Sequence, residues 1–211
     1  MRLLVATTNR NKLREIRGIF AGSPVILDGL DACAPVAEPE EAGSTFAENA
    51  RQKAVYYSSR LGVVAVAEDS GLEIDGLDGE PGVYSARYGG ADAETYPQKF
   101  ALIDRKLRER HALGSPARFV CALAVACEAR ILMEARGTIE GRIADAPSGT
   151  GGFGYDPIFL CGSLGRTMAE LTEAEKAVVS HRGQAFRQLR EFLAACNWTP
   201  GGWPWHRTDR R

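Results

Sequence analysis

Residues 63–71 read Val-Val-Ala-Val-Ala-Glu-Asp-Ser-Gly, and the rest of the chain is interpreted outward from this stretch. The continuous apolar run Val63–Ala67 predicts a buried central strand, because a strand covered on both faces is apolar at every position. The run ends at two carboxylates, Glu68 and Asp69, which is an unusual place for charge. Since neighbouring strand residues point to opposite faces, Glu68 and Asp69 can both reach one cleft only if the chain turns at Ser70-Gly71.

The segments on either side of this strand predict alternating strands and helices. Leu3–Ala6 is a short apolar run, and Thr7-Thr8-Asn9 after it can cap a helix that runs to about Phe20. Thr45-x-x-Glu48 is a capping-box pattern that precedes a second helix. The later segments predict a helix over 94–111, paired strands at Phe119–Cys127 and Ile131–Ile139, and a last helix with an apolar stripe at Phe186, Leu189 and Leu193.

This alternation predicts an α/β fold, with a mixed central sheet flanked by helices and two lobes that enclose a cleft. We expect residues 1–196 to form a single domain, because no repeat or low-complexity linker interrupts them. A chain of 211 residues buries roughly 70% of its unfolded surface, so it needs no disulfide or metal for stability. Residues 197–211 hold all three tryptophans and are rich in proline and glycine. We expect this tail to be disordered towards its end.

The overall charge and the cysteines limit the function classes. The formal net charge is −1, which argues against a general polyanion-binding protein but not against a local basic pocket for a small anion. No apolar run approaches the ~20 residues that span a bilayer. The five cysteines are odd in number and contain no C-x-x-C pair, so we expect reduced thiols and a cytoplasmic location.

Acidic and basic residues gather near the predicted strand ends and turns. The acidic set is Glu40, Glu41, Glu68 and Asp69, and hard cations such as Mg²⁺ are typically held by one or two carboxylates plus substrate phosphates. The alternative is an ordinary strand end that becomes solvated. The basic set is Lys12, Lys53, Lys176, His181 and Arg182.

Lys12 lies at a predicted helix N-terminus, where backbone N–H groups favour anions. Each lysine could equally lie on a solvated helix face, and the turn does not match the phosphate-binding loop G-x-x-x-x-G-K-[ST]. Ser70 with His181 suggests a serine hydrolase, but the chain has no G-x-S-x-G motif. The glycine-dense loop 149–157 does not fit a dinucleotide fingerprint, because Pro157 interrupts it. Its glycines would let a flat ligand approach the backbone and stack on Phe153 or Tyr155.

Six ordered motifs together are far more specific than any one of them. They are Ala6-Thr7-Thr8-Asn9-x-x-Lys12-x-x-Glu15, Thr45-Phe46-x-Glu48-Asn49-Ala50-x-x-Lys53-Ala54, Glu68-Asp69-Ser70-Gly71-Leu72, Pro81-Gly82-Val83-Tyr84-Ser85-Ala86-Arg87-Tyr88, Gly151-Gly152-Phe153-Gly154-Tyr155-Asp156-Pro157-Ile158-Phe159 and Ala169-Glu170-Leu171-x-x-x-Glu175-Lys176-x-x-x-Ser180-His181-Arg182. In this order they closely resemble the inosine/xanthosine triphosphate pyrophosphatase family, over about residues 3–193. Where that family usually has two aspartates, this chain has Glu68-Asp69.

The resemblance implies a homodimer and a Mg²⁺-dependent hydrolase that cleaves ITP, dITP and XTP to the monophosphate and pyrophosphate. It implies that Asp69 accepts the proton of the attacking water and that Glu40, Glu68 and Asp69 serve the metal. It also implies substrate contacts at Thr7, Thr8, Asn9, Arg10, Asn11, Lys12, Lys53, Ser70, Phe153, Gly154, Tyr155, Asp156, Lys176, His181 and Arg182.

The residues leave two alternatives to this function. A pyrophosphatase for other modified nucleotides, including pyrimidines, would carry the same phosphate-binding groups around a different base pocket. A nucleotide-binding sensor without turnover would not need Glu40, Glu68 and Asp69 together, so their joint presence favours an enzyme.

Overall fold

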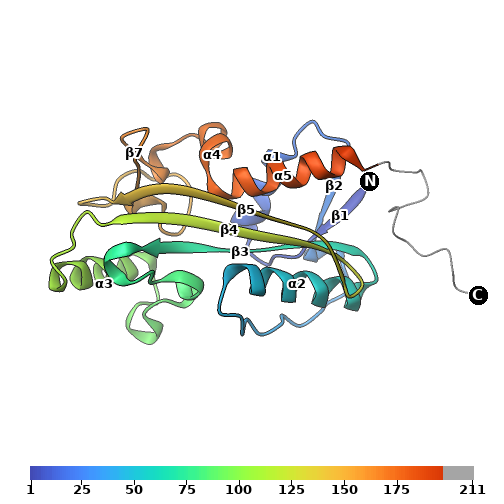
Figure 1. Cartoon of the computed structure of the whole chain (residues 1–211), viewed down its shortest axis with the longest axis horizontal. Coiled ribbons are helices and arrows are strands. Elements are labelled where there is room, and N and C mark those ends of the chain that lie inside the picture. The colour runs from blue at the N-terminus through green and yellow to red at the C-terminus, as the bar shows by residue number, and fades with distance from the viewer. Residues whose placement is uncertain (197–211) are drawn as a thin grey trace, which may run out of the picture.

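The computed structural model describes residues 1–196, and one seven-stranded mixed sheet runs through them (Figure 1). The strand order is β2-β1-β3-β4-β5-β6-β7. The first three of these strands are parallel to one another, and the pairs from β3 to β7 are antiparallel. The strands are β1 (Arg2–Val5), β2 (Ile26–Gly29), β3 (Val64–Ile74), β4 (Pro116–Cys127), β5 (Arg130–Ile143), β6 (Phe159–Cys161) and β7 (Arg166–Thr167). The predicted α/β class with a mixed central sheet is confirmed.

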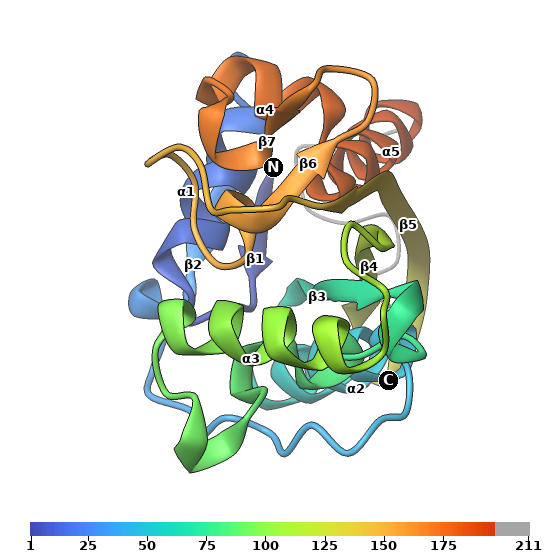
Figure 2. The same ribbon diagram turned by 90° about the vertical axis from the view of Figure 1, so that its left-hand side faces the viewer.

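Helices cover both faces of the sheet, with α1, α4 and α5 on one face and α2 and α3 on the other (Figure 1). The α-helices are α1 (Arg10–Ile19), α2 (Phe46–Leu61), α3 (Tyr96–Glu109), α4 (Glu173–Val179) and α5 (His181–Ala195). Short 3₁₀ helices are η1 (Leu30–Ala32), η2 (Asp75–Leu77), η3 (Gly82–Arg87), η4 (Gly90–Asp92), η5 (Asp156–Ile158) and η6 (Met168–Glu170). Figure 2, viewed along the sheet, shows the two layers of helices.

The strand β3 separates two apolar cores. Val64 and Val66 pack with the α1 and α5 side chains, whereas Ala65 and Ala67 pack with the α2 side chains. This alternation follows from the two-residue period of a strand. A third core lies towards α3, where Ile74 packs against residues of that helix.

The chain makes no turn at Ser70-Gly71, because β3 continues through these residues to Ile74, so the condition set for a shared cleft is wrong. β4 pairs with β3 without interruption from Val64–Cys127 to Ile74–Ala117, and this continuous ladder keeps the chain extended. β1 behaves differently and pairs with β3 only as far as Val66. Beyond Val66, no strand among residues 1–196 lies beside the β3 edge on that side, which leaves the edge open to ligand.

The predicted helix starts are confirmed. Asn9 caps α1, and the side chains of Thr45 and Thr172 accept N–H groups at the starts of α2 and α4. The third helix and the β4–β5 pair also lie where the sequence placed them.

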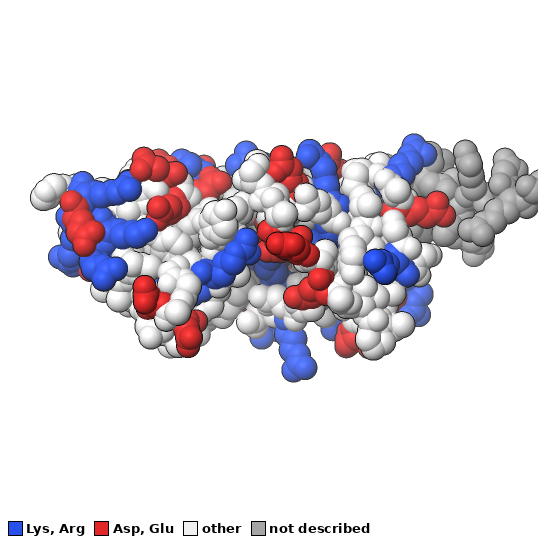
Figure 3. Space-filling model, turned by 90° about the horizontal axis from the view of Figure 1, so that it is seen from below, with Lys and Arg blue, Asp and Glu red and all other residues white. Residues whose placement is uncertain are grey.

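The described surface is mixed in charge. On the face seen in Figure 3, acidic and basic side chains are interspersed rather than gathered by sign. All five cysteines are free thiols. Within residues 1–196, no helix has the length and apolar character needed to cross a membrane. The predicted tail, residues 197–211, lies outside the described residues.

Candidate active site

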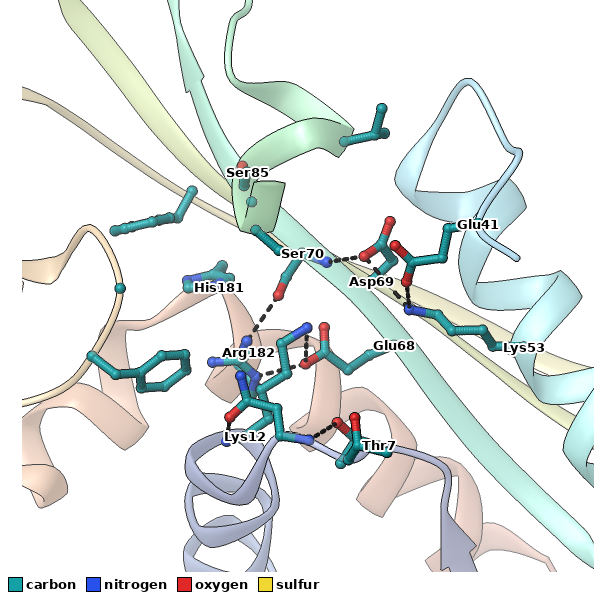
Figure 4. A pocket seen from close by; sticks show the side chains of 18 of the residues that line it. Thr7, Lys12, Glu41, Lys53, Glu68, Asp69, Ser70, Ser85, His181 and Arg182 are labelled. Atoms are coloured by element: carbon teal, nitrogen blue, oxygen red, sulfur yellow. Dashed lines mark hydrogen bonds and ion pairs between the residues drawn. The ribbon is translucent and has the colours of Figure 1, made fainter. Parts of the chain in front are cut away.

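A cleft of about 470 Å³ opens along the free edge of β3. It is bordered by the loop before α1, by the segment before α2, by η3 and by the loop before η5. Both Glu68 and Asp69 line it, although they point to opposite faces of the sheet (Figure 4). They share one cleft because β1 ends beside Val66, so a ligand can reach both faces around the strand edge.

On the α1/α5 face, Glu68 is compensated by two cations. Its Oε1 accepts from Arg182 Nε at 3.1 Å and lies 3.2 Å from Lys12 Nζ. Burial would raise the pKa of Glu68, but Arg182 and Lys12 outweigh burial and lower that pKa far below its usual range. Glu68 therefore stays ionised as part of a buried ion-pair network.

On the α2 face, Asp69 is held by groups from that helix. Asn49 Nδ2 donates to its Oδ2 at 2.9 Å, and Lys53 Nζ lies 3.6 Å from its Oδ1. Burial raises the pKa of Asp69, and Lys53 and Asn49 offset only part of that shift. Asp69 is thus a fixed carboxylate whose environment makes its oxygen more basic than that of a solvated aspartate.

Lys53 bridges Asp69 to Glu41, whose Oε1 lies 2.7 Å from Nζ. Burial would lower the pKa of Lys53, but Asp69 and Glu41 raise it overall. Glu41 also accepts from Arg87 Nη1 at 3.3 Å. Glu40, the glutamate predicted to serve a metal, is exposed and does not line the cleft. The neighbouring Glu41 lines the cleft instead, and Lys53 links it to Asp69.

The loop before α1 forms the border opposite Lys53 (Figure 4). Thr7 Oγ1 accepts the Asn9 N–H at 3.2 Å, and Asn9 Oδ1 accepts the N–H groups of Asn11 and Lys12 at 2.9 and 3.1 Å. The cleft is lined by Thr7, Thr8, Asn9 and Lys12, but not by the predicted contacts Arg10 and Asn11.

The other end of the cleft is built around the Phe153 ring. Lys176 Nζ lies 4.9 Å and the Arg182 guanidinium 5.5 Å from the ring centroid. Lys176 also contacts Asp156 Oδ2 at 2.5 Å and Glu15 Oε1 at 2.7 Å.

Burial raises the pKa of Asp156 despite the lowering effect of Lys176. Gly152 has φ +69°, and a Cβ there would clash with Asp156 Oδ2. The glycines of this loop therefore let the backbone approach the buried Lys176–Asp156 pair.

Arg182 is the most enclosed cation of the cleft, with a side chain 2% exposed. Besides Glu68, it donates from Nη1 to Glu15 Oε2 at 2.6 Å and from Nη2 to Ser70 Oγ at 2.9 Å. The side chain of Arg182 is thus engaged by Glu68, Glu15 and Ser70, and its predicted contact with substrate stays a prediction.

His181 stacks on Phe119, with centroids 4.9 Å apart and planes at 16°. Burial and the nearby Arg182 lower the pKa of His181 well below 6.5, so the ring is neutral. Among the described side chains, His181 Nδ1 is buried without a hydrogen-bond partner. The neighbouring Tyr155 donates its hydroxyl to the Ser85 carbonyl at 2.8 Å.

Comparison with known proteins supports this organisation. Residues 3–192 match the Ham1 family. The chain belongs to the Ham1 family. The chain is 44% identical over 193 residues to the dITP/XTP pyrophosphatase of Exiguobacterium sibiricum, with 92% of this chain and 97% of that protein covered. It is 45% identical over 195 residues to the enzyme of that name from Gloeobacter violaceus, with 92% and 94% covered.

Solved Ham1 structures share the fold. A HAM1 protein from Coxiella burnetii superposes with a TM-score of 0.84 at 37% identity, covering 92% of this chain and 98% of that one. The Ham1 protein of Staphylococcus aureus gives 0.81 at 36% identity, covering 92% and 98%. The predicted resemblance is thereby confirmed.

Glu41, which lines the cleft, and Asn49 and Glu15, which contact its lining residues, were not among the predicted site residues. Asn49 orients Asp69, Glu41 contacts Lys53, and Glu15 joins Lys176 to Arg182. Asn49 and Glu15 each stand in a motif that also contains a predicted site residue, which is the signal that could have identified them. Arg87, the last residue of η3, also stands in one of the six motifs, but that motif contains no predicted site residue.

Proposed function

We propose that this Ham1-family protein hydrolyses non-standard purine nucleoside triphosphates, ITP, dITP and XTP, to the monophosphate and pyrophosphate. The observation that carries the proposal is the composition of one cleft. It joins an aromatic end at Phe153 to a charged end where Lys53 lies between Glu41 and Asp69. The names of the relatives, dITP/XTP pyrophosphatases, support the same substrate class.

Base recognition is assigned to Phe153, for stacking, and to the Lys176 ammonium. Lys176 has three N–H donors, of which Asp156 and Glu15 engage two. The third donor suits the 6-oxo acceptor of hypoxanthine or xanthine. Adenine presents a 6-amino donor at that position, which would leave two donors facing each other.

The charge balance of the cleft argues for a divalent cation. Its basic and acidic lining residues are equal in number: Lys12, Lys53, Arg87, Lys176 and Arg182 against Glu38, Glu41, Glu68, Asp69 and Asp156. A triphosphate adds several negative charges to a site that is already balanced. Additional positive charge is therefore needed, and Mg²⁺ is the ion we propose.

Glu41 and Asp69 fit such an ion. The Lys53 ammonium lies between their oxygens, at 2.7 and 3.6 Å, and shows that this position attracts a cation. Within residues 1–196, no three acidic, histidine or cysteine side chains converge into a ready cation site. Two carboxylates plus substrate phosphates are a usual set for Mg²⁺. When bound, the ion would neutralise phosphate charge. Glu68, paired on the other face with Arg182, would not hold it directly.

Asp69 is assigned as the acceptor of a proton from the attacking water. Its Oδ2 is held by Asn49, and burial raises its pKa towards the range useful for a general base. Lys12, Lys53 and the Thr7–Asn9 loop would hold the phosphate chain while water attacks the α phosphorus.

The direct test is hydrolysis of ITP in ¹⁸O-labelled water with Mg²⁺. The label is expected in IMP, with unlabelled pyrophosphate as the second product. Label in pyrophosphate, or release of IDP and phosphate, would contradict the assignment. Running dUTP and dTTP beside ITP and GTP distinguishes a pyrimidine enzyme, and binding without pyrophosphate release would indicate a sensor.

Two further properties complete the proposal. The resemblance supports a homodimer, which sedimentation equilibrium at enzyme-assay concentrations would test. The five free thiols support a cytoplasmic location, because such thiols persist in a reducing compartment. Fractionation of cells that produce the protein would test this location.

A further inference from the structure

Arg87 is the most exposed cation that lines the cleft. Its side chain is 48% exposed, against 17% for Lys12, 14% for Lys53, 7% for Lys176 and 2% for Arg182. Within the described part of the chain, its hydrogen bonding is limited to one contact of Nη1 with Glu41 at 3.3 Å. The guanidinium also lies 5.0 Å from the centroid of the exposed Tyr84 ring. Most of its five N–H donors are therefore available to a ligand.

A continuous series of contacts orders the cleft from the base end to Arg87. Arg182 donates to Ser70, and the Ser70 N–H donates to Asp69 Oδ1 at 3.1 Å. Lys53 then joins Asp69 to Glu41, and Arg87 contacts the far oxygen of Glu41. A nucleotide with its base on Phe153 and its α phosphorus beside Asp69 would extend its last phosphates towards Arg87.

The backbone that carries Arg87 is fixed from three directions. Ser85 Oγ accepts the Leu72 N–H of β3 at 3.0 Å, and Tyr155 donates to the Ser85 carbonyl at 2.8 Å. From α3, the buried Lys99 ammonium donates to the Ala86 carbonyl. The backbone of η3 is thus fixed by hydrogen bonds, and η3 places the long side chain of Arg87 in the cleft.

We propose that Arg87 binds the terminal phosphate of the substrate and selects triphosphates over diphosphates; this inference rests on the proposed function. A guanidinium can form two parallel, charge-assisted hydrogen bonds to phosphate oxygens, which a weak 3.3 Å contact to one carboxylate does not prevent. After cleavage of the α–β bond, the same group holds the pyrophosphate product by its terminal phosphate.

The test compares Arg87→Met with the wild type for four ligands. Methionine keeps an unbranched side chain beside Tyr84 and removes the charge. The KM for ITP and the inhibition constant of inorganic pyrophosphate are each expected to rise about 10–100-fold, the range for a lost charge-assisted hydrogen bond. The inhibition constants of IDP and IMP, which lack the terminal phosphate, are expected to change less than about twofold, and kcat less than about threefold.

Arg60→Met is the matched control, because Arg60 also lies over a tyrosine, Tyr56, at 5.4 Å but outside the cleft. It is expected to leave all four constants unchanged. Arg87→Lys keeps the charge without the planar pair of donors, so its constants should fall between those of the wild type and Arg87→Met.

Two results would overturn the inference. One is an equal rise in the constants for ITP and IDP, which would mean that Arg87 acts through Glu41 on every nucleotide. The other is no change in the pyrophosphate constant. Both are distinguishable from failure of the proposed function, which would appear as a wild-type enzyme that does not release IMP and pyrophosphate from ITP.

Discussion

The two ends of the cleft carry similar charges in opposite physical states. At the base end, Lys176 and Arg182 are almost wholly enclosed and share Glu15. At the phosphate end, Lys53 and Arg87 share Glu41, whose side chain is 28% exposed. Both ends are balanced by carboxylates, but the two cations of the base end are buried, whereas Arg87 at the phosphate end is exposed.

This difference separates a preformed pocket from an exchangeable one. Buried ion pairs have lost their solvation and cannot part without a large cost. An exposed pair such as Arg87–Glu41 contributes little to stability, so phosphate can replace it readily. We therefore expect substitutions at the base end to affect folding, and those at the phosphate end to affect turnover and ligand binding.

The largest effect is expected at the phosphate end, for Asp69→Asn. The amide keeps the shape of Asp69 but cannot accept the proton, so kcat for ITP should fall about 10²–10⁴-fold. Steady-state kinetics at saturating Mg²⁺ would measure this. The thermal midpoint should stay close to that of the wild type, and a fully active variant would show that another group is the base.

At the base end, Arg182→Met is expected to lower the free energy of unfolding by about 3–5 kcal/mol, because Glu68 is left buried without Arg182. Urea unfolding monitored by circular dichroism would measure the change. Arg87→Met is the matched comparison and should cost less than about 1 kcal/mol, as exposed pairs do. Equal losses of unfolding free energy in the two variants would contradict the proposed difference between the buried base end and the exposed phosphate end.

Glu41→Gln tests whether Glu41 or its neighbour serves the cation. We expect the Mn²⁺ dissociation constant, read by electron paramagnetic resonance, to rise about tenfold, or about 1.4 kcal/mol. Glu40→Gln is the control for charge and position, and should leave the constant unchanged because Glu40 does not line the cleft. A larger rise of the dissociation constant in Glu40→Gln than in Glu41→Gln would instead indicate that Glu40 is the metal ligand.

The smallest effect concerns pH and His181. Its folded-state pKa is lowered below 6.5 by burial and by Arg182, so below pH 6.5 the unfolded chain binds a proton that the folded chain does not. Stability from neutral His181 is complete above pH 6.5 and is lost as the pH falls. When the pH falls from 7.5 to 5.5, His181 should lower the free energy of unfolding by about 1.4 kcal/mol.

The difference between the wild type and His181→Phe in urea unfolding at the two pH values isolates this contribution, since other groups titrate in both proteins. Phenylalanine can keep the stacking on Phe119. Identical pH dependence in the two proteins would mean that folding does not lower the pKa of His181.

Local patterns predicted the main elements well. The apolar run Val63–Ala67 correctly indicated the central strand, and Thr45 and Thr172 correctly indicated helix starts. These succeed because periodicity and capping depend on residues within a few positions of one another. The ordered motifs also identified most of the residues that line the cleft, from Thr7 to Arg182.

The strand end shows the limit of such local reasoning. Two charges after an apolar run indicated that β3 stops at Ser70-Gly71, yet β4 pairs with it as far as Ile74. The hydrogen-bonded ladder belongs to a partner strand some fifty positions away in the antiparallel register, such as Ser70 opposite Cys121. Charge in a strand is tolerated here because Arg182, Lys12 and Lys53 compensate it.

The sequence by itself determined the elements, the opposite directions of Glu68 and Asp69 along a strand, and the set of charges available to a site. Only the tertiary structure decided how those charges pair. Because β1 pairs with β3 only as far as Val66, the edge of β3 beyond it is open, and side chains from both faces of the sheet line one cleft. A contact between α1 and α5 assigns Glu15 to Arg182, and a contact between the segment before α2 and that helix assigns Glu41 to Lys53. Pairing of this kind depends on distance and burial in three dimensions, which no local spacing encodes.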